Sequence, residues 1–495
     1  MKKIFFVATL AVLLCSCSLP VNAAPEYMAD GAVFDAEWYR EQNPDIAATW
    51  PEEVPAEVLY QHYVTFGKNE GRTPYNAAGF DPANVLPYKG STAEAPDNVV
   101  QTNMTPAVSF NQDRQDYTWN RWAHTVKSYL YENQMGGLTR VEFIGQQIVV
   151  EDYDSSYRLV ASRNIPMELS KWGGFFAGDK YNFLIFGQDN PSQNDGTEVI
   201  RIVKYSKDWQ RLGQAGLYGA NTTVPFDAGS LRCAESGDYL YVRTSHKMYT
   251  SKDDGKNHQA NVTLALRQSN MDFTITYYYV MYDTMGYVSH SFNQFLLVDQ
   301  DQRLVTVDHG DAYPRSIIFM RCKMKDGGGK FDGNFLRSTI MKFPGNIGDN
   351  ETGASVGGLA ETTNGYVTVF NYDGAGGRGK RELYIAYTSK DSRGGLKSSA
   401  IKLTESEGVK TPVIAPTGLD GGYLMWNDKN GVFYYTRYTD GGQIGAVGTA
   451  DAALSDCQPV CHNGEVVWYV TSNSAPVFYR LNASGSITVM DTNRQ

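Results

Sequence analysis

Residues 286–316 concentrate the side chains that are best suited to chemistry. The segment reads as a strand, a tight turn and a second strand, which predicts a hairpin. Imidazole, amide, carboxylate, phenol and guanidinium groups stand at its two ends: His290, Asn293, His309, Asp311, Tyr313 and Arg315. Because a hairpin returns the chain to its starting edge, we expect both ends to lie at one edge of a sheet.

Two more histidines occur in strand-like sequence just upstream. His246 closes the run Arg243-Thr244-Ser245-His246, and His258 opens the run Asn257-His258-Gln259-Ala260-Asn261. The chain has 7 histidines. If these runs are neighbouring strands of one blade, its His246 and His258 join His290 and His309 at one end of two adjacent sheets.

Three interpretations of this cluster are open. Planar donors and acceptors beside aromatic rings are typical of glycan-binding sites, where Arg315 and Asp311 would anchor polar groups and the histidines would shape the pocket. Neutral imidazoles also bind divalent ions, so a metal-dependent polysaccharide lyase or hydrolase is the alternative, with a histidine or Tyr313 transferring protons. The metal candidates are His246, His258, His290 and His309. In the third interpretation, the same groups have a structural role alone and hold loops together by hydrogen bonds.

Glycan recognition is our first choice, and we expect binding rather than catalysis. A divalent metal is the one cofactor that the residues suggest. A scaffold for protein interactions is a further alternative, since a large repeated fold offers a broad surface.

Composition and repetition predict the fold that would position these groups. The chain has 495 residues, too many for one ordinary core, and it is rich in Gly (48), Tyr (33) and Phe (22). From residue 125 on, strand-like runs meet at polar turns at intervals of roughly 45 to 65 residues, the length of a four-stranded propeller blade. We predict an all-β, seven-bladed β-propeller over residues 120–495, with six or eight blades as alternatives.

The N-terminus predicts export. Lys2 and Lys3 precede a short apolar run, and Val21-Asn22-Ala23 fits a cleavage site, so residues 1–23 are predicted to be a signal peptide. Leu14-Cys15-Ser16-Cys17 also fits a lipoprotein signal that would anchor the protein through a lipid on Cys17. No other stretch is apolar enough to span a membrane. We expect an extracellular or cell-surface location, where disulfides are allowed and Cys457 could pair with Cys461.

The net charge of −10 and the lack of a basic block in the mature region argue against nucleic acid as a partner. An extracellular glycan or another surface polymer is the expected partner.

Residues 31–75 are predicted to form a small helical module, followed by a linker at 76–115. The module resembles a short unit of many bacterial secreted and surface proteins. The resemblance rests on Phe34-Asp35-Ala36, Tyr39, Asn43-Pro44-Asp45, His62-Tyr63, Gly67 and Glu70-Gly71-Arg72. We expect His62 to be a packed, structural histidine, because it falls at an apolar helix position.

The larger part resembles a group of secreted or surface β-propeller proteins of Gram-positive bacteria that have no settled function. The shared motifs are Thr244-Ser245-His246, Asn257-His258-Gln259-Ala260-Asn261, Ser289-His290-Ser291-Phe292-Asn293-Gln294 and Asp308-His309-Gly310-Asp311-Ala312-Tyr313-Pro314-Arg315. A looser likeness exists to oligogalacturonate lyases, which hold a metal with histidines. Ser251, Asp253 and Gly255 are similar to the structural Asp-box turn of sialidases, but the arginine triad of those enzymes cannot be assembled.

Overall fold

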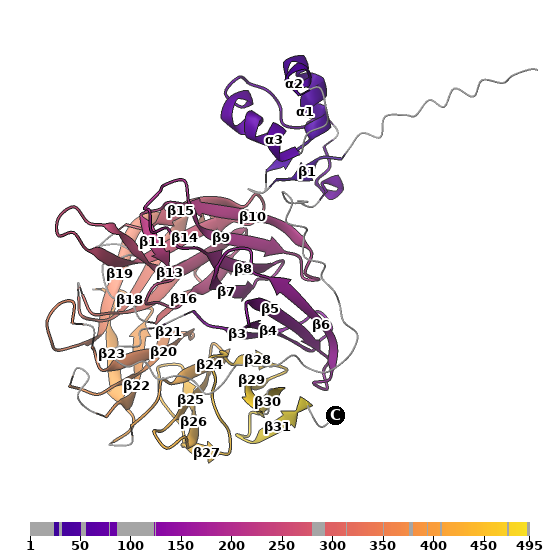
Figure 1. Ribbon diagram of the computed structural model, residues 1–495. Coiled ribbons are helices and arrows are strands. Elements are labelled where there is room, and N and C mark those ends of the chain that lie inside the picture. Colours follow the sequence, from indigo (N-terminus) through magenta and orange to yellow (C-terminus); the bar gives the residue numbers. More distant parts are fainter. Residues whose placement is uncertain are drawn as a thin grey trace, which may run out of the picture. The chain divides into compact units, whose positions relative to one another are not determined.

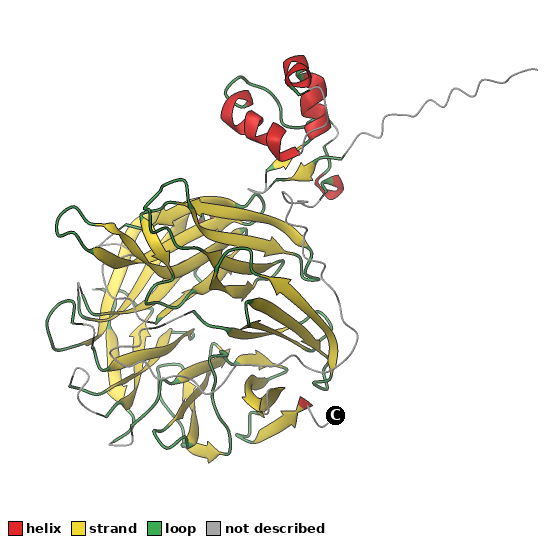
Figure 2. Cartoon of the chain, viewed as in Figure 1, coloured by secondary structure: helices red, strands yellow, loops and turns green. Residues whose placement is uncertain are grey.

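In the computed structural model the chain consists of an N-terminal unit and a larger unit. The structure describes residues 24–28, 32–50, 56–78, 80–86, 123, 125–279, 293–312, 314–349, 351–375, 380–393, 395–405, 408–472 and 475–492. The predicted signal peptide and residues 87–115 of the predicted linker lie outside these ranges. Within the ranges, no helix has both the length and the apolar character needed to cross a bilayer. Figure 2 shows that the α-helices belong to the N-terminal unit and that strands make up nearly all of the larger one.

The N-terminal unit packs three short helices against a small sheet. The helices are α1 (Ala36–Gln42), α2 (Pro44–Thr49) and α3 (Ala56–His62), which continues as a π-helical turn, η1 (Tyr63–Gly67). The sheet pairs β1 (Glu26–Tyr27) with β2 (Val33–Phe34), and Glu26 bridges to Leu86 beyond the 3-10 turn η2 (Pro82–Asn84). The unit therefore extends past both ends of the predicted range 31–75.

The motif residues of this unit have structural roles. The Asp35 side chain caps α1 by accepting a hydrogen bond from the Trp38 backbone N–H at 2.9 Å. His62 Nδ1 lies 3.0 Å from the Tyr39 hydroxyl, and a Cβ at Gly67 would lie 2.2 Å from that oxygen. His62 is thus packed and hydrogen-bonded, as the sequence predicts.

The larger unit is a seven-bladed β-propeller, which confirms the predicted fold class (Figure 1). Each blade is an antiparallel sheet. In six blades the four strands pair in chain order, whereas blade three has five strands, of which the first and the second both pair with the third.

The first strand of the propeller begins at Ser128, and blades one to three follow one another from there. Blade one holds β3 (Ser128–Glu132), β4 (Leu138–Ile144), β5 (Gln147–Tyr153) and β6 (Leu159–Pro166). Blade two holds β7 (Lys171–Ala177), β8 (Asn182–Gly187), β9 (Glu198–Tyr205) and β10 (Arg211–Tyr218). Blade three holds β11 (Thr222–Pro225), β12 (Arg232–Ser236), β13 (Tyr239–Thr250), β14 (Asn257–Arg267) and β15 (Asp272–Tyr277).

The other four blades follow the same plan. Blade four holds β16 (Gln294–Val298), β17 (Arg303–Gly310), β18 (Ser316–Lys325) and β19 (Lys330–Lys342), with the short turn η3 (Asp326–Gly328) between the last two. Blade five holds β20 (Ala354–Glu361), β21 (Gly365–Tyr372), β22 (Glu382–Ser389) and β23 (Ser398–Lys402). Blade six holds β24 (Val413–Gly418), β25 (Gly421–Asn427), β26 (Phe433–Thr439) and β27 (Gly448–Ala450). Blade seven holds β28 (Val460–His462), β29 (Glu465–Ser472), β30 (Ala475–Leu481) and β31 (Ile487–Asp491).

Apolar side chains fill most of the space between blades. Strands buried on both faces carry near-continuous apolar runs, such as Val466–Val470 in β29. Separate clusters of buried residues join blades one and two, two and three, four and five, and six and seven. The four cysteines of the described ranges, Cys233, Cys322, Cys457 and Cys461, are free thiols. Cys457 and Cys461, which the sequence allows to pair, are not joined, and Cys457 is buried while Cys461 is exposed.

The ring closes where blade seven meets blade one (Figure 1). In the described ranges these two blades share no strand, so side chains make the closure. Asp456 accepts hydrogen bonds from the Lys127 backbone N–H at 2.8 Å and from the Ser128 hydroxyl. The Tyr469 hydroxyl donates to Glu142 at 2.9 Å. An apolar cluster that includes Leu130, Tyr153, Val467 and Phe478 fills the rest of the contact.

We predict that Asp456→Asn destabilises the propeller by about 1–3 kcal/mol, because the new amide leaves one of the two donors of blade one without an acceptor. Urea unfolding of the full chain measures this loss. Asp451→Asn, a change at an exposed aspartate five residues earlier, is the control. Equal midpoints for the two variants would show that Asp456 does not hold the ring closed.

Candidate ligand-binding site

One end of the propeller is named the loop end. It carries the loops that join the second and third strands of the four-stranded blades, and the loop from β13 to β14 in blade three. They include residues 188–197, 251–256, 311–315 and 428–432. The opposite end, where first and second strands join, is named the turn end. In an antiparallel blade, the start of the first strand and the end of the second strand lie at the loop end. The register Gln294↔Asp308 confirms this for blade four.

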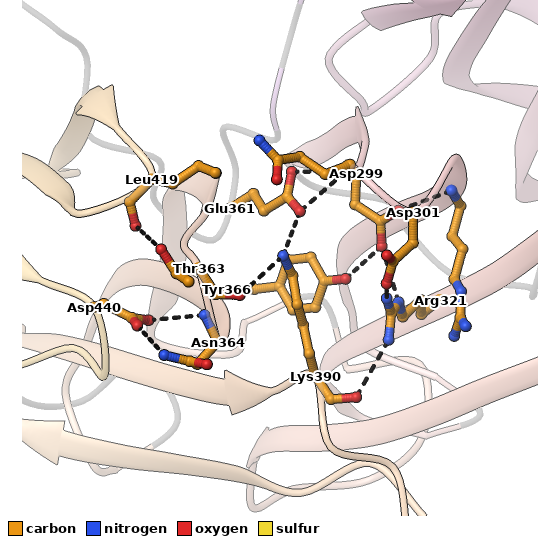
Figure 3. Close-up of polar contacts among 12 residues, drawn as sticks. Asp299, Asp301, Arg321, Glu361, Thr363, Asn364, Tyr366, Lys390, Leu419 and Asp440 are labelled. Carbon is orange, nitrogen blue, oxygen red and sulfur yellow. Dashed lines mark hydrogen bonds and ion pairs between the residues drawn. The ribbon is translucent and has the colours of Figure 1, made fainter.

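At the turn end, polar groups of blades four, five and six form the network drawn in Figure 3. Arg321 donates to Asp299 within blade four at 2.9 Å, and the Tyr366 hydroxyl of blade five donates to the same carboxylate at 2.5 Å. Lys390 forms an ion pair with Glu361 within blade five at 2.6 Å. The Asn364 backbone N–H of blade five donates to Asp440 of blade six at 3.1 Å, so this contact and the Tyr366–Asp299 contact link neighbouring blades.

His246 and His309 both lie at the loop end and are buried. His246 is in β13, where its Nδ1 lies 2.6 Å from the Thr222 hydroxyl. His309 is in β17, where its Nε2 lies 2.7 Å from the Thr352 hydroxyl. Burial lowers the pKa of both rings to about 3, with Arg381 and Arg315 adding to the effect at His309. Both imidazoles are therefore neutral at physiological pH.

The two rings face different blades, because side chains alternate along a strand. In β13, Arg243 points to Asp308 of blade four, so His246, three residues on, points the other way, toward blade two. In β17, Asp308 points to blade three, so the adjacent His309 points toward blade five. The structure therefore brings these histidines to one end of the propeller without bringing their rings together.

The remaining predicted residues divide into three groups. His290 and Tyr313 lie outside the described residues. His258 is exposed and lies 3.0 Å from Asp254, within the Asp-box-like turn between β13 and β14. Asn293, Asp311 and Arg315 are buried between blades four and five. Among the described residues, no three His, Cys, Asp or Glu side chains are placed to share a metal ion.

Arg315 fixes the loop that leads into blade five. Its guanidinium donates to the backbone carbonyl of Pro344 at 2.7 Å, and to those of Asp349 and Glu351. The Gly348 N–H donates to the Asp311 carbonyl at 3.1 Å. This arrangement gives Arg315 a structural function, and its predicted role as an anchor for polar groups of a ligand stays a prediction.

The contact between blades three and four is polar toward the loop end. Its innermost group is a buried ion pair, in which Arg243 Nε and Nη2 donate to Asp308 at 2.8 and 2.7 Å. Asn261 donates to Asp308 at 3.4 Å and accepts a hydrogen bond from Gln294 Nε2. The Gln294 backbone N–H donates to Ser230 at 3.1 Å.

This series of polar groups continues to the edge of the loop end. The Ser245 hydroxyl donates to the Asp227 carbonyl at 2.5 Å, and Gln259 Nε2 donates to the Asp227 carboxylate at 3.1 Å. The strand register places Arg243, Ser245 and then Lys247 opposite Thr263, Asn261 and Gln259, so these groups are stacked in order. We call the set the polar column: Ser230, Arg243, Ser245, Gln259, Asn261, Gln294, Asp308 and Asp227.

The backbone around Asp227 is strained. Phe226 and Ala228 have φ of 62° and 55°, a left-handed conformation that costs energy in residues with a Cβ. The strain turns the chain tightly before β12 and brings Gly229 against Ser245, whose hydroxyl would lie 2.1 Å from a Cβ at that glycine. The fold thus holds Asp227 in place, with its side chain partly exposed.

One buried polar atom of the polar column has no hydrogen-bond partner among the described residues. It is Oε1 of Gln294, a residue that is 1% exposed. Because an unpaired buried acceptor is costly, this position indicates a site for water or a ligand.

Most members of the polar column were not among the predicted site residues. Asn261, Gln294 and Asp308 stand in the motifs that carry the propeller resemblance, but the histidines beside them drew the functional interpretation. Asp227 has no distinctive neighbours in sequence, so only the strained backbone identifies it.

No protein-family model and no curated protein matches the chain. Solved structures of low similarity include a Lactobacillus plantarum protein at 13% identity, with a TM-score of 0.42 and coverage of 74% of this chain and 94% of that one. Prolyl oligopeptidase B from Galerina marginata is 10% identical, with a TM-score of 0.43 and coverage of 75% and 53%. A prolyl endopeptidase is 12% identical, with a TM-score of 0.39 and coverage of 93% and 64%. These likenesses carry no information on activity, and the resemblances drawn from the sequence motifs stay predictions.

The two buried histidines predict a pH dependence of stability. Their folded pKa of about 3 is below the ordinary 6.5, so the unfolded chain binds more protons between these values. The contribution of these histidines to the free energy of unfolding is therefore fully present above pH 6.5. It falls as the pH drops toward 3, by about 1.4 kcal/mol per pH unit for each histidine.

His246→Gln should reduce this slope by the share of one histidine, in urea unfolding between pH 4.5 and 7. His309→Gln should reduce the slope by a similar share, because the His309 ring is buried in the same way. An identical slope in His246→Gln and the parent would contradict the assignment.

Proposed function

We propose that the protein is an extracellular recognition protein that binds a glycan at the loop end of blades three and four. A β-propeller in general suits ligand binding or interaction, since it presents loops from every blade at one end. The polar column supports the proposal, because it places hydrogen-bonding groups from the ion pair outward to Asp227.

The chemistry of the column favours a neutral, hydroxyl-rich ligand. Arg243 and Asp308 neutralise each other, so neither charge is available for a charged ligand. Gln294 Oε1 is an acceptor without a donor, and the Asp227 carboxylate accepts one described hydrogen bond from a side chain. Hydroxyl groups of a sugar can donate to both kinds of acceptor.

The predicted export signal at residues 1–23 supports a location outside the cell, with lipid anchoring through Cys17 as part of the proposal. In that location the ligand would be a surface or extracellular polysaccharide.

We predict that Asp227→Ala weakens glycan binding by roughly ten-fold or more, because a charge-assisted hydrogen bond contributes about 1.5–3 kcal/mol. An array of extracellular glycans identifies a ligand for the full chain, and titration calorimetry measures its affinity for each variant. Asp253→Ala is the matched control, since it removes an exposed aspartate from the turn between β13 and β14 at the same end.

Two results would overturn the proposal. One is an array without any bound glycan. The other is an Asp227→Ala variant that binds as tightly as the Asp253→Ala control.

A further inference from the structure

A group of tyrosines lies at the loop end between blades two and three, beside the site proposed above. Tyr278 and Tyr279 directly follow β15, the outermost strand of blade three. Tyr249 lies near the end of β13, and the loop from β8 to β9 brings Asp195 next to it. We call Asp195, Tyr249, Tyr278 and Tyr279 the tyrosine patch.

We propose that the tyrosine patch is a second subsite that binds the ring of a neutral sugar. The proposal rests on the proposed function, and it adds residues and a ligand chemistry that the polar column does not supply.

The aromatic part of the patch is open to solvent. Tyr279 is 58% exposed, and its ring centroid lies 4.5 Å from that of Tyr278 at an interplanar angle of 43°. The Tyr278 ring packs against the apolar core between blades two and three, and this contact fixes its position. An exposed ring supported by a fixed ring offers the flat apolar surface on which the carbon face of a pyranose packs.

The polar part of the patch stands beside these rings. The Tyr249 hydroxyl donates to Asp195 Oδ1 at 3.1 Å and accepts from Asn190 Nδ2 at 3.0 Å. Burial and the bond to Asp195 raise the pKa of the Tyr249 hydroxyl, so it stays protonated. The Asp195 side chain is exposed and can accept hydrogen bonds from sugar hydroxyls.

Hydrogen bonds and a close contact with a glycine fix the loop that carries Asp195. The buried side chain of Asn190 donates to the Asn194 carbonyl at 3.0 Å and accepts from the Asn194 N–H at 3.0 Å. Gly219 has a φ of 59° and approaches Asp195 so closely that a Cβ there would lie 2.6 Å from the Asp195 Cα. Only glycine fits this position without strain.

The test uses the full chain and three soluble probes: chitopentaose, cellopentaose and mannopentaose. Titration calorimetry measures their affinity for the parent, for Tyr279→Ala and for Asp195→Asn. Tyr218→Ala is the matched control, because Tyr218 is 57% exposed and lies at the end of β10 on the face turned away from blade three.

We expect at least one probe to bind, with a loss of ten-fold or more in Tyr279→Ala and Asp195→Asn. Tyr279→Phe should keep most of the affinity, since it keeps the ring. Tyr218→Ala should bind like the parent.

The proposal is overturned if none of the three probes binds the parent, or if Tyr279→Ala and Asp195→Asn both bind like Tyr218→Ala. The function proposed for the polar column is judged separately, on the wider glycan array and on Asp227→Ala. Loss of binding in Asp227→Ala alone would retain the polar column and reject the patch. Loss of binding in Tyr279→Ala alone would retain the tyrosine patch and reject the polar column.

Discussion

The ion pair between Arg243 and Asp308 is the interaction on which the loop end depends. Both side chains are at most 1% exposed, and they join two blades whose contact is otherwise apolar toward the turn end. Burying two charges is costly, and removal of one partner from such a pair typically destabilises a protein by about 3–5 kcal/mol. The pair also orients Asn261 and, through it, Gln294. An apolar contact would join the blades without this cost, so the pair indicates that the geometry of the polar groups above it matters.

The two ends of the propeller use their polar residues differently. At the turn end, ion pairs within blades four and five stand beside hydrogen bonds that join blades four, five and six (Figure 3). At the loop end, Gln294 Oε1 is a buried acceptor without a described partner, in the contact between blades three and four. Strain is also present there, at Phe226 and Ala228, outside any hairpin turn. Unpaired acceptors and strained backbone cost stability, so their coincidence indicates a place where the fold gives up stability for function.

The sequence predicts more of the fold than of the site. Polar turns between β-branched runs recur along the chain, and each blade is a local antiparallel unit, so the blade count follows from short-range pattern. The site depends on which face each residue takes in its sheet. His246 and His309 both lie in strands that run toward the loop end, but Arg243 and Asp308 occupy the faces that meet between blades three and four. The packing of two blades decides which face of each sheet contacts the other. The sequence of a single strand does not reveal that choice. Arg315 shows the same limit, because its partners are backbone carbonyls some 30 residues away.

The account claims that the Arg243–Asp308 pair is retained for the shape of a binding site. Replacing a buried ion pair by apolar residues is often neutral or stabilising, so Arg243→Met with Asp308→Leu can restore packing while removing the orientation of Asn261 and Gln294. The decisive measurement is glycan affinity of this double variant, once urea unfolding shows that it is as stable as the parent. We predict a stable propeller whose affinity is at least ten-fold weaker. A stable double variant with the affinity of the parent would contradict the account.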